Sequence, residues 1–179
     1  MASLVPISSK SLGSHSNLPK EVATQPLPET VNYGLPVRLK IPKLAVDAAI
    51  TYVGLTKTGD MAAPTNISDV AWYKNGSLPG NTGSAVLAGH LDGARGVPGV
   101  FASLNKLQKG DTLQVIDSKG TVISFTVRET RTYGEDVQPK EVFNAVDTAR
   151  LNLITCAGAW DTTHQHYQKR LVIFADKTG

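Results

Sequence analysis

The chain has 179 residues, and 41% of them are hydrophobic, so it can bury the core of one domain. Only 18% are charged, and the net charge of +3 comes from scattered lysines and arginines, which argues against a nucleic-acid partner. No stretch approaches the about 18 to 20 consecutive apolar residues of a membrane span. The N-terminus also lacks the apolar segment of a secretory signal, so we expect a soluble chain.

Two regions differ in composition. Residues 1–35 are rich in Ser, Pro, Thr and Asn, with few large apolar groups to offset the entropy of ordering, and they predict a flexible N-terminal arm. Residues 36–179 are predicted to form one folded domain. The 16 glycines and 10 prolines favour short segments joined by tight turns, so we interpret this domain as mainly β.

The elements follow from the hydrophobic pattern and the turn formers. Strands are predicted at residues 36–42, 49–53, 84–89, 112–116, 121–130, 150–155 and 171–175. Short helical turns are predicted at residues 69–73, 101–104 and 139–143. About eight strands with a few short helices favour a closed β-barrel over a sandwich, although periodicity alone does not separate the two. The predicted fold class is therefore all-β, a single closed eight-stranded barrel.

The single cysteine is the most informative residue. Cys156 closes the apolar run 151–156 where Ala157 and Gly158 should end a strand, so it would lie at a strand tip beside a loop. A thiol in such a position is a candidate nucleophile. The alternative is a small buried hydrophobic residue, which is the commoner role of an isolated cysteine.

Two further residues could complete a catalytic site. His90 follows the buried strand 84–89, and Arg170 opens the strand 171–175, so both would lie at strand ends. An imidazole can move the thiol proton, and a guanidinium can stabilise an oxyanion. Taken singly, His90 is as easily a loop histidine bonded to a carbonyl, and Arg170 an edge-strand residue that maintains solubility.

The order of these motifs resembles the sortases, the cysteine transpeptidases that attach proteins to Gram-positive cell envelopes. The resemblance is carried by Ala88-Gly89-His90, then residues 153–156, then Lys169-Arg170 before an apolar strand. Further matches lie at residues 36–42, 53–55, 72–83 and 101–111, so the similarity covers about residues 36–176. The pattern is closest to classes E, F or D, but it does not assign a subclass.

The resemblance implies an eight-stranded barrel in which Cys156 attacks the carbonyl after Thr in a sorting signal of LPxTG type. A thioacyl enzyme would follow, and an amine of a peptidoglycan precursor or a pilin lysine would release the product. By the same similarity His90 is the general acid and base, and Arg170 orients substrate and stabilises the oxyanion. The neighbours Thr155, Ala88, Leu87 and Trp160 are expected to bind substrate. No cofactor and no metal are expected.

The resemblance also implies an extracytoplasmic, cell-surface enzyme whose full-length form is membrane-anchored, and the expected anchor is not in this sequence. Asn152 departs from the family, which usually has Thr there, and its side chain is expected to be peripheral to the chemistry. The segment 157–169 is expected to be a short loop. Its residues Trp160, Asp161, His164, His166 and Tyr167 could shape the substrate groove or merely cover the barrel mouth.

Two other motifs offer weaker hypotheses. His164 and His166 could ligate zinc with Asp161 or Asp92, but two loop histidines are more often solvated. Residues Leu27-Pro28-Glu29-Thr30 resemble a sorting signal, with Val31 where that signal has Gly. Chance is the simpler explanation in a proline-rich arm, and a tethered pseudosubstrate is the alternative.

Three functional classes therefore stay open on the residues alone. They are a cysteine transpeptidase, a cysteine hydrolase on the same barrel, and a non-catalytic binding module with a structural Cys156. The resemblance favours the first.

Overall fold

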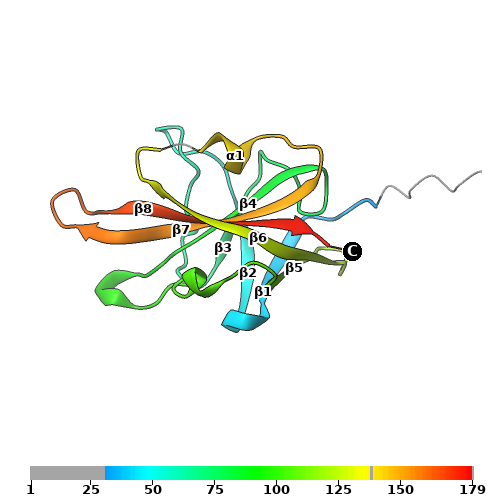
Figure 1. Ribbon diagram of the computed structural model, residues 1–179, viewed down its shortest axis with the longest axis horizontal. Helices are drawn as coiled ribbons and strands as arrows, with labels where there is room; N and C mark the ends of the chain where they lie inside the picture. Colours follow the sequence, from blue (N-terminus) through cyan, green and yellow to red (C-terminus); the bar gives the residue numbers. More distant parts are fainter. Residues whose placement is uncertain (1–30, 138, 179) are drawn as a thin grey trace, which may run out of the picture. The chain divides into compact units, whose positions relative to one another are not determined.

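The computed structural model describes residues 31–137 and 139–178. Eight strands close into one barrel in the order β1-β2-β3-β4-β7-β8-β6-β5, which confirms the predicted fold class. Figure 1 shows the strands wrapping around a common interior, with the single short α-helix of the described residues, α1, outside them. The strands are β1 Pro36–Ile41, β2 Val46–Val53, β3 Val70–Tyr73, β4 Gly83–Gly89, β5 Thr112–Asp117, β6 Val122–Gly134, β7 Ala149–Asp161 and β8 His166–Lys177.

The pairing pattern brings the segments before Cys156 and His90 together. The β4 and β7 strands are parallel neighbours, with Ala88 opposite Ile154, although a long stretch of chain separates them. The β7 and β8 strands are antiparallel neighbours along most of their length. In Figure 1 β7 and β8 run side by side from the barrel out to a projecting hairpin. The barrel thus places β4, β7 and β8 next to one another.

One predicted helical turn is wrong. A short helical turn was expected at residues 69–73. Instead, Val70–Tyr73 forms β3, which is parallel to β2 and antiparallel to β4. Val70 and Trp72 are buried in the barrel core, so this strand is stabilised by contacts with residues distant in sequence. The other two helical expectations have short counterparts, a 3-10 helix at Leu104–Lys106 and α1 at Lys140–Phe143.

The segment between Ala157 and Lys169 is not a short loop. Strands β7 and β8 continue through it, with Trp160 opposite Tyr167 and Asp161 opposite His166. The connecting turn covers residues 162–165, and Gln165 has a positive φ of 57° there. Trp160 and Tyr167 pack edge to face with their ring centroids 5.0 Å apart, a contact of the kind that stabilises paired strands.

Alternation along the strands divides the apolar side chains between two clusters. Leu87, Leu153 and Ile173 point into the barrel core, whereas Val86, Val172 and Phe174 form a smaller cluster outside it with Val142 of α1. Figure 1 shows α1 on this side of the barrel, near β4.

Asn152 links α1 to the barrel. It is completely buried, and its Nδ2 donates to the Val142 carbonyl at 2.7 Å. Its side chain therefore makes an internal link between β7 and α1 and does not lie on the surface.

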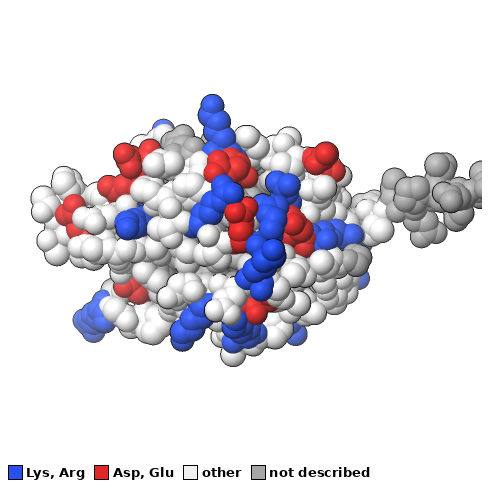
Figure 2. Space-filling model, in the orientation of Figure 1, with Lys and Arg blue, Asp and Glu red and all other residues white. Residues whose placement is uncertain are grey.

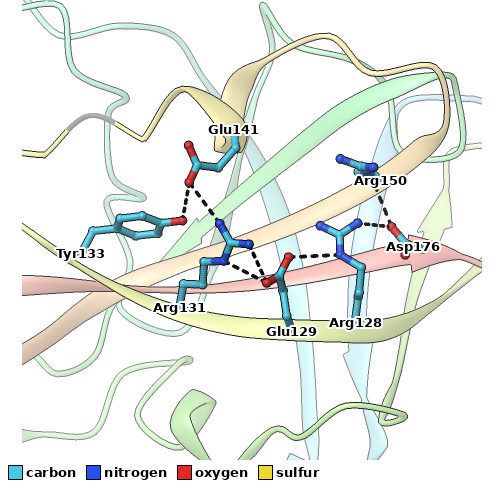
Figure 3. Close-up of polar contacts among 7 residues, drawn as sticks. All are labelled: Arg128, Glu129, Arg131, Tyr133, Glu141, Arg150 and Asp176. Carbon is cyan, nitrogen blue, oxygen red and sulfur yellow. Dashed lines mark hydrogen bonds and ion pairs between the residues drawn. The ribbon is translucent and has the colours of Figure 1, made fainter.

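A polar network covers part of the outer face of β6 and β8 (Figure 3). It joins α1 to β6 through Glu141, and β7 to β8 through Asp176, whose carboxylate accepts from Arg128 at 2.8 Å. The face drawn in Figure 2 likewise interleaves cations and anions rather than gathering one sign. Such networks contribute more than isolated surface pairs do. The members are Arg128, Glu129, Arg131, Tyr133, Glu141, Arg150 and Asp176.

Contacts to the barrel begin upstream of β1, in residues that the sequence assigns to the arm. The Gly34 amide donates to Asp117 at 2.7 Å, and Asn32 accepts from Lys119 at 2.6 Å. The candidate pseudosubstrate Leu27-Pro28-Glu29-Thr30 lies outside the described residues. Within residues 31–137 and 139–178, no helix has the length and apolar character needed to cross a membrane.

Candidate active site

A cavity of about 510 Å³ opens where β4 ends, beside Cys156 of β7. It lies between the loop that follows β4 and the projecting β7–β8 hairpin, so residues distant in sequence meet in it. Two of the predicted catalytic residues, His90 and Cys156, line this cavity, together with the predicted substrate residue Trp160. The full lining comprises His90, Leu91, Asp92, Gly93, Ala94, Arg95, Gly96, Cys156, Trp160 and Tyr167.

The strand register explains why these residues meet. The parallel pairing of β4 with β7 ends at Ala88 and Ile154, and two residues further along each chain are His90 and Cys156. On the other side of β7, Cys156 is paired directly with Arg170 of β8. Cys156 and Arg170 have the same strand parity as the outer-cluster residues Ile154 and Val172, so they lie on the outer face of β7 and β8. His90 lies in the loop just beyond β4.

The backbone before the two cavity residues is tied together. Thr155 Oγ1 donates to the Gly89 carbonyl at 2.8 Å in a buried hydrogen bond. Thr155 precedes Cys156 and Gly89 precedes His90, so this bond fixes the end of β4 relative to β7. The His90 carbonyl is fixed as well, because it accepts from the Phe101 amide at 2.9 Å.

The His90 ring has a defined tautomer. Its Nε2 lies 2.7 Å from the Pro64 carbonyl oxygen. A carbonyl can only accept, so we assign the proton of the neutral ring to Nε2. Nδ1 then carries the free lone pair and is the ring atom that can take a proton from a thiol.

The Cys156 thiol is half-buried and free of any disulfide. Burial raises its pKa above the ordinary range, the positive charge of Arg170 opposes that rise, and the negative charge of Asp92 adds to it. The protonated form therefore dominates in the free protein near neutral pH. A nucleophilic reaction at this sulfur needs a base at hand.

Arg170 influences the thiol without lining the cavity. Its Nη1 donates to the Tyr167 carbonyl at 2.7 Å and to the Lys169 carbonyl at 2.9 Å. These bonds hold the guanidinium along β8, beside Cys156. A guanidinium stays charged at any working pH, so Arg170 is a fixed cation next to the sulfur.

Two of the predicted substrate residues are buried. Leu87 is fully buried in the barrel core and Thr155 is 3% exposed. Both belong to the strand segments that lead to His90 and Cys156. Ala88 is half-buried, and Trp160 is 50% exposed at the cavity.

A family model for the sortase domain matches residues 39–178. This chain belongs to the sortase family. The comparison with curated protein sequences gives no match. Among solved structures, this sortase resembles sortase C-1 from Actinomyces oris, at 23% identity and a TM-score of 0.61 over 80% of this chain and 75% of that one.

Two other solved structures extend the comparison. The lid mutant of sortase A from Corynebacterium diphtheriae has 16% identity and a TM-score of 0.63, covering 85% of this chain and 74% of that chain. The Sortase D5 transpeptidase of Clostridium perfringens has 20% identity and a TM-score of 0.61, covering 84% of each chain. At these identities the likeness shows the shared fold and leaves the subclass of this sortase unassigned.

Sequence reasoning overlooked one feature of the cavity. Asp92 was considered only as a zinc ligand, and Tyr167 only as one of several loop residues, but the Tyr167 hydroxyl donates to the Asp92 carboxylate within the cavity lining. Asp92 follows His90 by two residues, a spacing that places side chains on one side of an extended segment. That signal could have linked Asp92 to the site.

Two further histidines of the described residues, His164 and His166, lie at the hairpin and are engaged with carboxylates. His164 Nδ1 is 2.9 Å from Asp161, and His166 pairs with Glu135. Asp161 also accepts from the backbone of the turn, and its hydrogen bond with His164 is the main cause of its lowered pKa. In the part of the chain that the structure describes, no group of three or more His, Cys, Asp or Glu side chains is placed to hold a metal ion.

Proposed function

We propose that this sortase cleaves an LPxTG-type sorting signal after Thr and transfers the acyl group to a cell-envelope amine. The observation that supports the proposal is that His90, just beyond β4, lines one cavity with Cys156 of β7, which is paired with Arg170 of β8. Family membership supports the transpeptidase class in general. The sorting signal and the three catalytic roles are part of the proposal.

The first half-reaction forms a thioester. His90 Nδ1 takes the thiol proton as Cys156 Sγ attacks the carbonyl carbon of Thr, and the carbonyl oxygen becomes an oxyanion. Both backbone bonds of Arg170 use Nη1, so the other N–H groups of the guanidinium are assigned to the oxyanion. The C–N bond then breaks, His90 returns the proton to the leaving amine, and the acyl group stays on sulfur.

The second half-reaction releases the product. A neutral amine attacks the thioester carbonyl, His90 takes a proton from the attacking nitrogen, and collapse of the intermediate expels the Cys156 thiolate. The His90 proton then returns to sulfur, so the enzyme is regenerated and one amide bond has replaced another. The acceptor is an amine of a peptidoglycan precursor or a pilin lysine. We place this reaction outside the cytoplasm, at a cell surface, on a membrane-anchored full-length form.

The test is peptide cleavage with and without an added amine. Incubation with LPxTG-type peptides, with glycine or diaminopimelate as acceptor, should give a ligated product detectable by mass spectrometry. Cys156→Ala and His90→Ala should each abolish both cleavage and ligation. Cleavage that the amine leaves unchanged would identify a hydrolase instead, and a folded protein that cleaves nothing and whose thiol resists alkylation would contradict the enzymatic proposal.

A further inference from the structure

A polar bridge crosses the candidate active-site cavity. The Tyr167 hydroxyl donates a hydrogen bond to Asp92 Oδ2, joining residues that are 75 positions apart in the chain. Asp92 belongs to the loop that follows β4 and His90, whereas Tyr167 belongs to β8, beside the strand that carries Cys156. Both residues line the cavity. The bridge therefore connects the histidine side of the site to the cysteine side.

Both ends of the bridge rest on ordered structure. Asp92 pairs with Pro98 in an isolated β-bridge, and the Gly93 amide donates to the Val97 carbonyl at 2.8 Å, so the loop folds back on itself. On the other side, the Tyr167 ring packs against Trp160 across the hairpin. Because neither end is a free side chain on a mobile surface, the bond between them fixes the distance across the cavity.

The bridge leaves a negative charge in place. Its donor is a phenol, which is neutral, so the Asp92 carboxylate is hydrogen-bonded without being neutralised. The bond to Asp92, together with burial, raises the pKa of Tyr167 to about 12, so the phenol stays protonated and keeps donating at neutral pH. The carboxylate acts electrostatically on the nearby Cys156 thiol.

Other charged or titratable groups also face the thiol. Arg170 lies beside Cys156 on β8, and its positive charge acts in the opposite sense to Asp92. His90 at the end of β4 and Arg95 in the following loop line the same cavity. Asp92 is thus the one carboxylate among the described residues that line the cavity with Cys156.

We propose that Asp92 and Tyr167 form a positioning pair that spans the cavity, and that the charge of the Asp92 carboxylate opposes ionisation of the Cys156 thiol. The pair holds the loop after His90 against β8, and it keeps the sulfur protonated until substrate enters. That the pair acts in peptide cleavage and acyl transfer rests on the proposed function. The thiol's ionisation can nevertheless be measured without any peptide substrate.

The decisive measurement is the rate of Cys156 alkylation by iodoacetamide as a function of pH. Asp92→Asn keeps the size of the side chain and an acceptor oxygen but removes the charge. The inflection of the rate–pH curve should therefore move to lower pH. Well below the inflection the rate should rise at least about threefold, the change in thiolate fraction that half a pH unit produces. Tyr167→Phe keeps the aromatic ring and leaves the Asp92 carboxylate in place. The inflection of its rate–pH curve should therefore not move to lower pH.

Matched controls separate a local effect from a change in net charge. Asp147→Asn alters the same charge at an exposed loop residue, and Tyr52→Phe removes a hydroxyl from β2. Both should give the wild-type profile. If Asp92→Asn has the wild-type inflection, or a shift equal to that of Asp147→Asn, the electrostatic part of the proposal is wrong.

The positioning part has its own measurement, which also serves if Asp92→Asn does not fold. In Tyr167→Phe, amide hydrogen exchange in residues 91–99 should be faster than in wild type, while exchange in β5 and β6 is unchanged. Equal exchange in residues 91–99 would overturn the pair as a structural bridge. Both measurements use the free protein, so an absence of peptide cleavage would contradict the proposed function without affecting this result.

Discussion

The hydroxyl of Thr155 is hydrogen-bonded to the carbonyl of Gly89, and each of these residues immediately precedes a proposed catalytic residue. The bond is buried and 2.8 Å long, and it joins parallel strands that are distant in sequence. It lies just beyond the last regular pair of the two strands, where His90 follows β4 and Cys156 continues along β7. We expect Thr155 to set the spacing between His90 and Cys156.

Replacing Thr155 with Val tests this role. Val retains the branched shape but leaves the buried Gly89 carbonyl without its donor, so the free energy of unfolding should fall by about 1 to 3 kcal/mol. Because small displacements of reacting groups are costly, kcat for peptide cleavage should fall by about tenfold or more. Thr51→Val is the matched control, since Thr51 also donates to a carbonyl of a neighbouring strand, at 3.2 Å, away from the cavity. Equal kcat in the two variants would contradict the positioning role.

The close approach of Gly99 to His90 gives a second prediction. A Cβ at residue 99 would lie 2.3 Å from the His90 carbonyl oxygen, closer than atoms can approach, so the backbone of one residue must move. Gly99→Ala should therefore displace His90, lower the melting temperature and reduce peptide cleavage by about tenfold or more. Gly54→Ala is the control, because its Cβ would meet only the flexible end of Lys74 at 3.5 Å. Full activity in Gly99→Ala would show that the position of His90 is not set by this contact.

The lowered pKa of Asp117 leads to a prediction of how the stability of the fold depends on pH. Burial alone would raise the pKa of this carboxyl, but the amides of Gly34, Thr121 and Lys119 donate to it, and the net effect lowers the pKa. The ionised form therefore stabilises the fold at every pH above the unfolded value of about 3.9, and this contribution is lost as the pH falls through the lowered folded value.

The test is urea unfolding of wild type and Asp117→Asn at several pH values. At pH 7 the variant should be less stable by about 1 to 3 kcal/mol, because an amide cannot accept all of these bonds as a carboxylate does. The difference should shrink in acid as the wild-type carboxyl takes up a proton. A difference that stays constant down to pH 2 would mean that the charge of Asp117 does not contribute.

Arg170 should act on the thiol in the opposite sense to Asp92. Removing its charge in Arg170→Gln should move the alkylation inflection of Cys156 to higher pH, because the cation favours the thiolate. The same variant should lose most peptide cleavage if the guanidinium stabilises the oxyanion. Lys74→Gln removes a cation from an exposed residue and should leave the profile unchanged. An inflection at or below the wild-type value in Arg170→Gln would contradict the electrostatic role.

The parts of the fold that follow local rules could be predicted from the sequence. The strand before His90 is a continuous apolar run closed by turn formers, so its end was visible without coordinates. The apolar run before Cys156 likewise predicted a strand, but it did not show that β7 continues to Asp161. The meander of β5 and β6 follows from alternation and from the turn at residues 118–120. Together with the motif order, these elements were enough to predict a closed barrel.

What depends on distant pairing could not be predicted. Residues 70–73 form a strand because β2 and β4 lie on either side of them, and nothing local indicates those partners. The hairpin beyond Ala157 looks like a polar loop, because its strands are held by contacts such as Trp160 with Tyr167. Without that hairpin, Tyr167 could not be placed near Asp92, so the bridge across the cavity was not foreseen.

The most direct test of the account is the intact mass of the protein after brief mixing with an LPxTG-type peptide in the absence of an amine. The account predicts a covalent adduct equal in mass to the peptide fragment through Thr, mapped to Cys156, absent in Cys156→Ala and discharged by added diaminopimelate. An adduct located elsewhere would contradict it, as would cleavage that persists in Cys156→Ala.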